Sequence, residues 1–318
     1  MNDDIKMAAT RDGFGQALLE LGAKDPRVVV LCADLAESTR VLAFKEKYPD
    51  RYIEVGVAEQ NLATLAAGLA NYGKIPFIAS YAAFSPGRNN EQIRTTISLN
   101  NLPVKIVGAH AGLSVGPDGA THQALEDLAL MRVQPHMTVV SPCDSEEARK
   151  ATLAIAALPG PAYLRLAREK TPVLTTTETP FELGKVNVAW SSEHAPEVAV
   201  FATGPLLSNA LLAAKELQFS IPTEVINVHT IKPLDAPAVL AAAKGAGAVV
   251  TVEEHQVAGG LGSAISELLA ATYPLPTEFI GVHDQFGQSG EPKELLEHYG
   301  MGVSHIVQAI KKAHARKG

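Results

Sequence analysis

Polar residues in the N-terminal half of the chain have the types and spacing needed for acid–base chemistry. Glu59 follows the apolar run 52–57 and precedes the Ala- and Leu-rich stretch 61–70, so it stands between an expected strand and an expected helix. A carboxyl group surrounded by Ala and Leu suits a general acid working near neutral pH. The structural alternative is that Glu59 only complements the dipole of the helix it begins.

Six further residues follow other apolar runs of the same half at short distances. They are Asp34, Tyr81, His110, Asp118, His122 and Arg168. Ligands of open parallel sheets bind at the carboxyl ends of strands, so these side chains are expected to share one cleft with Glu59. A single histidine on an apolar strand is more often a core residue, but so many polar groups at one edge favour a site.

Basic residues of this half indicate an anionic ligand. Guanidinium groups bind phosphate in bidentate geometry, and Arg11, His110 and Arg168 could together hold a phosphate group. The loop 111–123 is rich in glycine, which lets a backbone approach a ligand closely. The sequence therefore predicts a phosphate-binding region near Glu59.

Apolar strand-like runs alternate with helix-like stretches along the whole chain, which predicts mostly parallel sheets with helices on both faces. In the N-terminal half the expected strands are 28–34, 52–57, 75–80, 104–110, 137–140 and 162–168. The expected helices there are 8–22, 61–70, 82–100, 124–131 and 146–157. The strand 52–57 and the helix that follows it are both expected to be buried.

A polar stretch with proline, 175–180, is the expected linker, and the alternation restarts after it. The fold class predicted is α/β, with two doubly wound, mostly parallel domains over residues 1–178 and 179–318. Gly260-Leu-Gly262 follows a strand and opens a helix, but Ile265 replaces the third glycine of a dinucleotide fingerprint. Close helix–strand packing is the preferred interpretation, and the second domain is expected to be architectural.

Composition excludes several classes of partner. The chain has 318 residues, 47% hydrophobic and 19% charged, and a net charge of -7 without a basic cluster, so neither nucleic acid nor a membrane is expected as a partner. Cys32 and Cys143 lack the spacing of a disulfide framework or a zinc site. Residues 1–6 lack the features of a signal peptide, and no apolar run reaches the length of a membrane span, so a cytoplasmic location is expected.

Three segments resemble the C-terminal half of transketolase, namely its pyrimidine-binding domain followed by its C-terminal domain. Val57-Ala-Glu59-Gln60 is similar to the segment that bears the family's catalytic glutamate. The motif His110-x3-Ser114-Val-Gly-x-Asp118-Gly-x-Thr-His122-Gln123 is similar to the family's substrate loop. Ala33-Asp34-Leu35 followed by Ser38 is similar to the loop that meets thiamine and sugar phosphate.

The resemblance implies thiamine diphosphate as cofactor and a ketose phosphate as substrate. It implies that Glu59 hydrogen-bonds N1′ of the aminopyrimidine ring, that Tyr81 and Phe84 stack on this ring, and that Asp34 lies near the thiamine. Asp118 and His122 correspond to contacts with the ketose hydroxyls, and His122 also to a catalytic role. The implied sugar-phosphate ligands are Arg11, Ser38, His110 and Arg168.

Two departures from full-length transketolases leave alternatives open. Those enzymes carry a histidine where this chain has Gln60, and a third aromatic where it has Gly87. Gln60 looks more like deoxyxylulose-phosphate synthase or the β subunit of 2-oxo acid dehydrogenases. His110 argues against the synthase, which has an arginine there, and the pair Asp118 and His122 argues against the dehydrogenase subunit.

The resemblance also implies that a second polypeptide completes the site. The family's diphosphate and Mg²⁺ site is a Gly-Asp-Gly motif followed by an asparagine, and this chain has no Gly-Asp-Gly. Hard cations need oxygen ligands, and no such set is expected on this chain. We therefore expect one subunit of a two-chain transketolase, present as a homodimer within an α₂β₂ assembly. Its N-terminal-type partner would hold the diphosphate and Mg²⁺.

Overall fold

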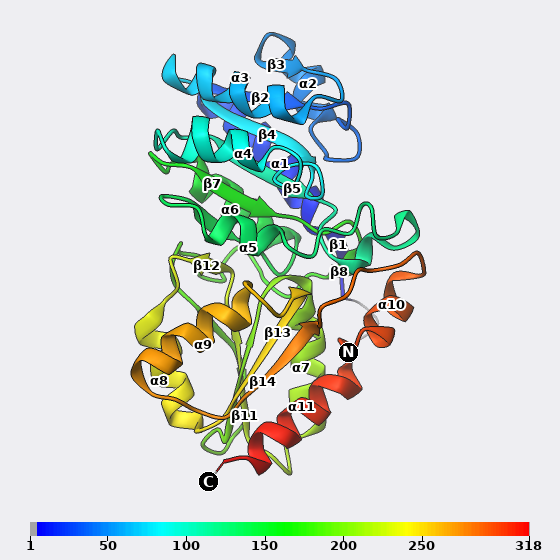
Figure 1. The fold of residues 1–318 in the computed structure, drawn as a ribbon, viewed down its shortest axis with the longest axis vertical. Helices are drawn as coiled ribbons and strands as arrows, with labels where there is room; N and C mark the ends of the chain where they lie inside the picture. The colour runs from blue at the N-terminus through cyan, green and yellow to red at the C-terminus, as the bar shows by residue number, and fades with distance from the viewer. Residues whose placement is uncertain (1–4, 318) are drawn as a thin grey trace.

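The computed structural model describes residues 5–317, which form two α/β domains stacked along the long axis of the molecule (Figure 1). Residues 1–4, part of the segment used above to judge export, lie outside the described range. The predicted fold class, two mostly parallel sheets covered by helices, is confirmed. No helix within the described range is both long and apolar enough to cross a membrane.

The first domain is built on a seven-stranded sheet in the order β12-β6-β7-β5-β4-β2-β3, parallel except for β12. Its strands are β2 (Val28–Cys32), β3 (Tyr52–Glu54), β4 (Ile75–Tyr81), β5 (Lys105–Ala109), β6 (Thr138–Val140), β7 (Ala162–Arg165) and β12 (Thr230–Lys232). Successive strand residues point to opposite faces, so the apolar strands need cover on both. One face packs on α1 (Thr10–Lys24), α2 (Leu42–Lys47) and α6 (Ser145–Ala156). The other packs on α3 (Glu59–Asn71), the π-helix η2 (Ile93–Ser98) and α5 (Asp127–Arg132).

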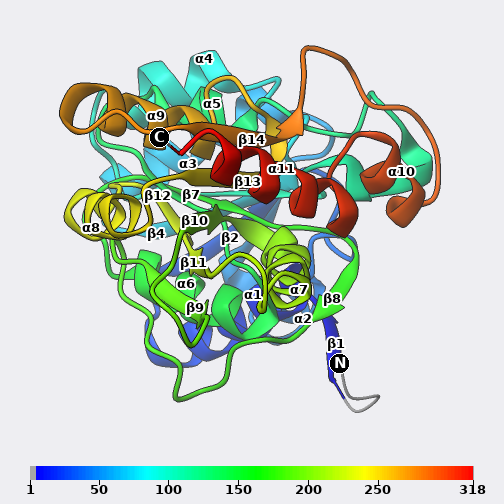
Figure 2. The ribbon, with the colours of Figure 1, turned by 90° about the horizontal axis from the view of Figure 1, so that it is seen from below.

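The second domain has a five-stranded sheet in the order β14-β13-β10-β11-β9, in which only β9 is antiparallel. Its strands are β9 (Asn187–Ser191), β10 (Val198–Ala202), β11 (Thr223–Asn227), β13 (Val249–Gln256) and β14 (Thr277–Val282). Figure 2 shows α8 (Ala236–Ala246) and α9 (Leu261–Thr272) on one side of this sheet, and α7 (Leu207–Glu216) and α11 (Val303–Ala315) on the other. The predicted close packing at Gly262 is confirmed, because a Cβ there would lie 2.8 Å from the side chains of Phe279 and Thr251.

Short elements complete the fold. They are the helix α4 (Asn90–Gln92), the helix α10 (Pro292–His298), and the 3₁₀-helices η1 (Pro49–Arg51), η3 (Leu113–Asp118) and η4 (Gly204–Leu206). Three short strands that the sequence pattern did not indicate connect distant segments. The strand β1 (Met7–Ala9) pairs with β8 (Lys170–Pro172), and β12, which lies after β11 in the chain, extends the first sheet beside β6.

Three local expectations near the site are wrong. The strand expected over 52–57 is the three-residue edge strand β3, and Val57 beyond it is 72% exposed. The helix α3 exposes one side, including Gln60 and Thr64, so it is amphipathic rather than buried all round. The helix expected over 82–100 begins only at Asn90, after a tight turn in which a Cβ on Gly87 would lie 2.1 Å from the carbonyl oxygen of Ala83.

Candidate active site

The parallel strands of the first sheet end at a common edge. Cys32 near the end of β2 pairs with Glu54 of β3 and Ala79 of β4, and Tyr81 at the end of β4 pairs with Ala109 of β5. The residues predicted to carry chemistry follow these strand ends, where ligands of open parallel sheets bind. They are Asp34 after β2, Glu59 after β3, Tyr81 at the end of β4 and His110 after β5.

Glu59 is the first residue of α3, and its expected burial is confirmed, since it is only 2% exposed. Its surroundings differ from the expectation, because Nη1 of Arg88 donates a hydrogen bond of 2.6 Å to Oε2 of Glu59. The backbone carbonyl of Glu59 accepts a hydrogen bond of 2.9 Å from Nδ2 of Asn89. Sequence reasoning missed Arg88. In the helix expected over 82–100, a spacing of four residues would have placed Arg88 beside Phe84, and this was the available signal. The turn 84–88 therefore approaches Glu59 from the β4 side.

Four rings form a compact aromatic group beside this pair. The rings of Tyr81 and His110 stack with centroids 3.9 Å apart, and the ring of Phe84 lies 5.9 Å from that of Tyr81. His122, from the predicted substrate loop, meets Phe84 edge-on at 5.3 Å and Tyr81 at 6.1 Å. The guanidinium of Arg88 lies 4.6 Å from the Phe84 centroid. Glu59 is thus connected through Arg88 to the aromatic group, whose ring faces suit packing against a planar ligand.

His110, one of the four rings, also lies close to three arginines. Nη1 of Arg11 lies 3.3 Å from Nε2 of His110 and donates to the carbonyl of Ser38 at 2.8 Å. The charges of Arg168 and Arg40 also act on His110. Sequence reasoning included Arg11, Ser38, His110 and Arg168 but missed Arg40, which no strand-end pattern marks. We call Arg11, Arg40, Arg168 and His110 the cation cluster.

The cation cluster carries positive charge around a neutral imidazole. Burial, together with the neighbouring Arg11, lowers the pKa of His110 to about 3, so this ring is uncharged at neutral pH. An arginine only donates hydrogen bonds, so Nε2 of His110 accepts and the proton resides on Nδ1. Asp12, at 2.7 Å from Arg40, and Glu169, at 3.1 Å from Arg168, offset part of the charge. The remaining charge, centred on Arg11, favours an anionic ligand.

The β1–β8 pairing explains how two arginines far apart in sequence meet. Met7 pairs with Pro172 and Ala9 with Lys170, which places the start of α1 beside the segment that follows β7. The backbone N–H of Ala167 donates to Oγ1 of Thr10 at 2.8 Å. Arg11 directly follows Thr10, and Arg168 directly follows Ala167. The small two-stranded sheet therefore sets the geometry of the cation cluster.

The predicted substrate loop, residues 111–123, is held in place by the second domain. The backbone N–H of Ser114 donates to Oε1 of the buried Glu254 at 2.5 Å, and its hydroxyl lies 3.2 Å from Oε2. Nε2 of Gln123 donates to the carbonyl of Gln288 at 3.0 Å. The second domain, expected to be architectural, therefore shapes the substrate loop directly.

Gly112 is a position at which this arrangement leaves no room for an added methyl group. Its φ is +92°, and a Cβ there would lie 2.5 Å from the Glu254 carboxyl group. Gly73, with φ of +77° and no heavy atom within 4 Å of a Cβ, is a control for positive φ without crowding, whereas Gly112 also has a ψ of 179°, a region nearly restricted to glycine. Gly73→Ala should cost about 1–2 kcal/mol from backbone strain alone, and Gly112→Ala clearly more, as measured by thermal or chemical unfolding. Equal losses would show that the Glu254 contact is loose in solution.

Two of the predicted site residues make no side-chain contact with the groups described above. Asp34 and Asp118 are exposed, and within residues 5–317 their carboxylates form no hydrogen bond or ion pair. The backbone N–H of Asp34 donates to Oε1 of Glu54 at 2.7 Å, and Asp34 has a φ of +60°. Both carboxylates are therefore accessible to a ligand at the strand edge.

The residues present fit the aminopyrimidine half of thiamine diphosphate. A buried carboxylate can bond a ring nitrogen, and the nearby rings of Phe84 and Tyr81 can pack on a heterocycle. Over the described range, no group of three or more His, Cys, Asp or Glu side chains is placed to hold a metal ion.

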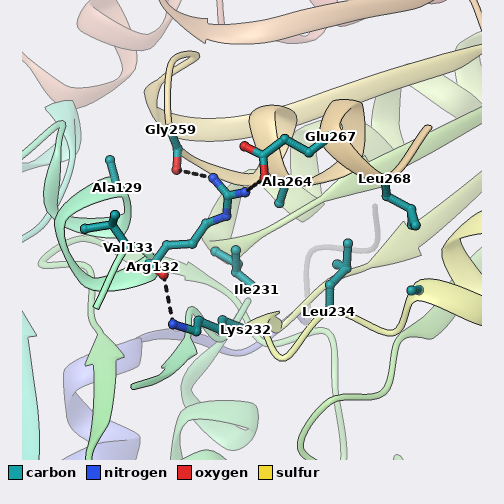
Figure 3. Close-up of a pocket in the computed structure, with 11 residues that line it drawn as sticks. Ala129, Arg132, Val133, Ile231, Lys232, Leu234, Gly259, Ala264, Glu267 and Leu268 are labelled. Carbon is teal, nitrogen blue, oxygen red and sulfur yellow. Dashed lines mark hydrogen bonds and ion pairs between the residues drawn. The ribbon is translucent and has the colours of Figure 1, made fainter. Parts of the chain in front are cut away.

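A separate groove of about 760 Å³ lies between the domains, lined by parts of α5, β12 and α9 (Figure 3). Its two cations are already engaged. Arg132 pairs with Glu267 and donates to the carbonyl of Gly259 at 3.1 Å, while Nζ of Lys232 donates to the carbonyl of Arg132 at 3.0 Å. These bonds connect the two domains, so the groove belongs to the domain interface rather than to the candidate site described above.

Two family models match the chain. One is described as transketolase, pyrimidine binding domain, and matches residues 6–173. The other is described as transketolase, C-terminal domain, and matches residues 184–306. Together they span both domains of the structure.

Individual relatives point the same way. The chain is 42% identical to the 6-deoxy-6-sulfo-D-fructose transketolase subunit SqwH of Clostridium sp. (strain MSTE9), over 96% of this chain and 95% of that protein. It is 34% identical to an apulose-4-phosphate transketolase subunit of Phocaeicola vulgatus, over 94% and 96% of the two chains. A solved structure described as a split gene transketolase, inactive beta4 tetramer, superposes with a TM-score of 0.90 at 43% identity, covering 98% of this chain and 99% of that one.

Proposed function

The chain belongs to the transketolase family, and from that premise we propose that it is one subunit of a split transketolase. In this proposal the enzyme depends on thiamine diphosphate and transfers a two-carbon ketol unit between sugar phosphates. One observation carries the proposal, namely that the buried Glu59 and the cation cluster are connected to the same aromatic group, Glu59 through Arg88 at Phe84 and Arg11 through His110. A cofactor ring near Phe84 and a sugar anion near His110 would place a sugar chain across the rings.

The cofactor, when bound, supplies the nucleophilic carbon that accepts the ketol unit, and this chain's residues arrange the ligands around it. Glu59 would hold the proton shared with N1′ of the pyrimidine, as its burial at the start of α3 supports. Phe84 and Tyr81 would pack on the pyrimidine, with Asp34 near the thiamine. His122, edge-on to Phe84 at 5.3 Å, would contact ketose hydroxyls and exchange protons with them, and Asp118 would bind another hydroxyl.

The cation cluster would bind the terminal anion of the sugar. Arg11 and Arg168 supply charged donors, Ser38 lies within the same contact network, and Arg40 adds a further positive charge. Neutral His110 offers hydrogen bonding without charge. A phosphate and a sulfonate present similar oxygen acceptors to these donors, and one relative is named for a sulfosugar. Whether the sugar substrate carries a phosphate or a sulfonate is therefore the first question to test.

A companion subunit of the N-terminal type would supply the diphosphate and Mg²⁺ site in an α₂β₂ assembly in the cytoplasm. Apolar side chains exposed around α3 support an interface there. They are Val57 at 72%, Leu65 at 37%, Tyr72 at 90% and Leu99 at 74%. Large apolar side chains exposed on and beside one helix suit a protein–protein contact. A relative solved as a β4 tetramer supports self-association of such chains.

Reconstitution tests the proposed function. The purified chain, its companion subunit, thiamine diphosphate and Mg²⁺ are mixed with ketose phosphates, sulfosugars, unphosphorylated ketoses and 2-oxo acids as donors. Ketol transfer to an aldose acceptor from an anionic ketose is the expected result. Turnover of 2-oxo acids alone would favour the dehydrogenase class instead, and condensation of pyruvate with an aldose phosphate would favour a synthase.

Arg168→Ala should raise KM for phosphorylated sugars much more than for unphosphorylated ones. Loss of a charge-assisted contact costs about 1.5–3 kcal/mol, or roughly 10- to 100-fold in affinity. The control is Arg27→Ala, since Arg27 is 64% exposed and its side chain pairs, among residues 5–317, only with Asp25. Arg168 also donates to the carbonyl of Val115 at 3.1 Å, so an equal rise for both sugar classes would show a purely structural role.

A further inference from the structure

The ion pair between Arg88 and Glu59 joins a buried group to a side chain that reaches the surface. Glu59 is 2% exposed, whereas the Arg88 side chain is 48% exposed. Nη1 of Arg88 lies 2.6 Å from Oε2 of Glu59, and the guanidinium carbon lies 4.6 Å from the centre of the Phe84 ring. The guanidinium therefore bridges the carboxylate and the aromatic ring.

A planar group that donates N–H to Glu59 while packing on Phe84 makes the same two contacts proposed above for the pyrimidine ring of the cofactor. Because the guanidinium occupies the space that joins these groups, it and the pyrimidine exclude each other. We propose that Arg88 is an intramolecular placeholder, which occupies the pyrimidine position in the free site and is displaced when the cofactor binds. This inference rests on the proposed function and names a residue that the resemblance did not assign.

The surroundings support an exchange rather than a permanent bond. A buried carboxylate without a partner is unfavourable, so Glu59 gains from a donor while the site is free. Arg88 can regain solvation outside the site because half of its side chain already meets solvent. The residue before Arg88 is Gly87, which has no side chain, and a Cβ there would lie 2.1 Å from the carbonyl oxygen of Ala83. The apparent affinity for cofactor is then reduced by the fraction of sites that Arg88 occupies.

Cofactor binding to the assembled enzyme tests the exchange. Titration calorimetry with thiamine diphosphate at constant Mg²⁺ compares wild type, Arg88→Gln, Glu59→Gln and the double variant. Arg88→Gln is expected to tighten binding about tenfold when Glu59 is present and to change nothing in the Glu59→Gln background. Arg94→Gln, an exposed arginine on η2, is the matched control and should behave as wild type.

Weaker or unchanged binding by Arg88→Gln would overturn the inference and leave the proposed function standing. Failure of the wild-type assembly to bind the cofactor would overturn both. Thermal melting of the isolated chain gives a readout that does not depend on the cofactor. Arg88→Gln should lower the melting temperature by about 2 °C in the wild-type background. It should not lower the melting temperature when Glu59 is also replaced by Gln. An unchanged melting temperature would show that the pair does not form. If Arg88→Gln fails to fold, Arg88→Lys keeps the charge but loses the planar contact, and should tighten cofactor binding to a smaller extent.

Discussion

Glu59→Gln is expected to lower turnover of the reconstituted enzyme on the order of 10²-fold or more. The substitution keeps the size of a side chain that is 2% exposed at the start of α3, but it removes the carboxylate proposed to share a proton with the cofactor ring. Steady-state kinetics with a saturating ketose phosphate measures the loss. Near-normal turnover would show that Glu59 has no role in proton transfer to the cofactor.

The fold and the assembly must be unchanged for this comparison to hold. Glu91→Gln is a suitable control, because Glu91 is an exposed residue on α4 whose carboxylate accepts a hydrogen bond from Nε2 of the adjacent Gln92. Turnover by this control should match wild type. An equal loss in both variants would indicate a general effect of charge on the region rather than a role for Glu59.

The chain without its companion subunit is expected to give no ketol transfer and to bind thiamine diphosphate weakly at best. The contacts that it is proposed to make are one hydrogen bond from Glu59 and packing on Phe84 and Tyr81. Aromatic packing adds about 0.5–1.5 kcal/mol beyond burial, whereas association costs about 4 kcal/mol or more. The charge-assisted contacts to the diphosphate are assigned to the companion subunit.

Calorimetry of the isolated chain with thiamine diphosphate and Mg²⁺ measures this directly, and an assay at high protein concentration measures residual transfer. Light scattering of the same sample should report a homo-oligomer, because apolar residues such as Tyr72 and Leu99 are exposed beside α3. Micromolar binding of the cofactor, or ketol transfer by the chain alone, would contradict the split-subunit proposal.

Much of the fold could be predicted because its signals are local. Buried parallel strands are continuous apolar runs, so β2, β4 and β10 were recognisable from their residues alone. Because parallel strands end at one edge, the approximate positions of Glu59 and His110 followed from the same pattern. Edge strands carry weaker signals, and β3 was misjudged as buried because an apolar run does not reveal its neighbours.

The contacts inside the site were decided by tertiary structure. Arg11 and Arg168 meet because β1 pairs with β8, and a three-residue strand has too few residues to show a period. The partner of Glu59 is Arg88, which a tight turn at Gly87 brings back toward α3.

The predicted substrate loop gives the clearest contrast between sequence and tertiary structure. Its residue types and spacing, from His110 to His122, were sufficient to mark it as a candidate in the sequence. Its conformation depends on Glu254, which approaches from the other domain and accepts the hydrogen bond of Ser114. Local sequence determined which residues stand at the strand ends, because propensity and periodicity act over a few residues. Only tertiary structure decided which of them touch, because those contacts join residues that are between 29 and 157 positions apart in the chain.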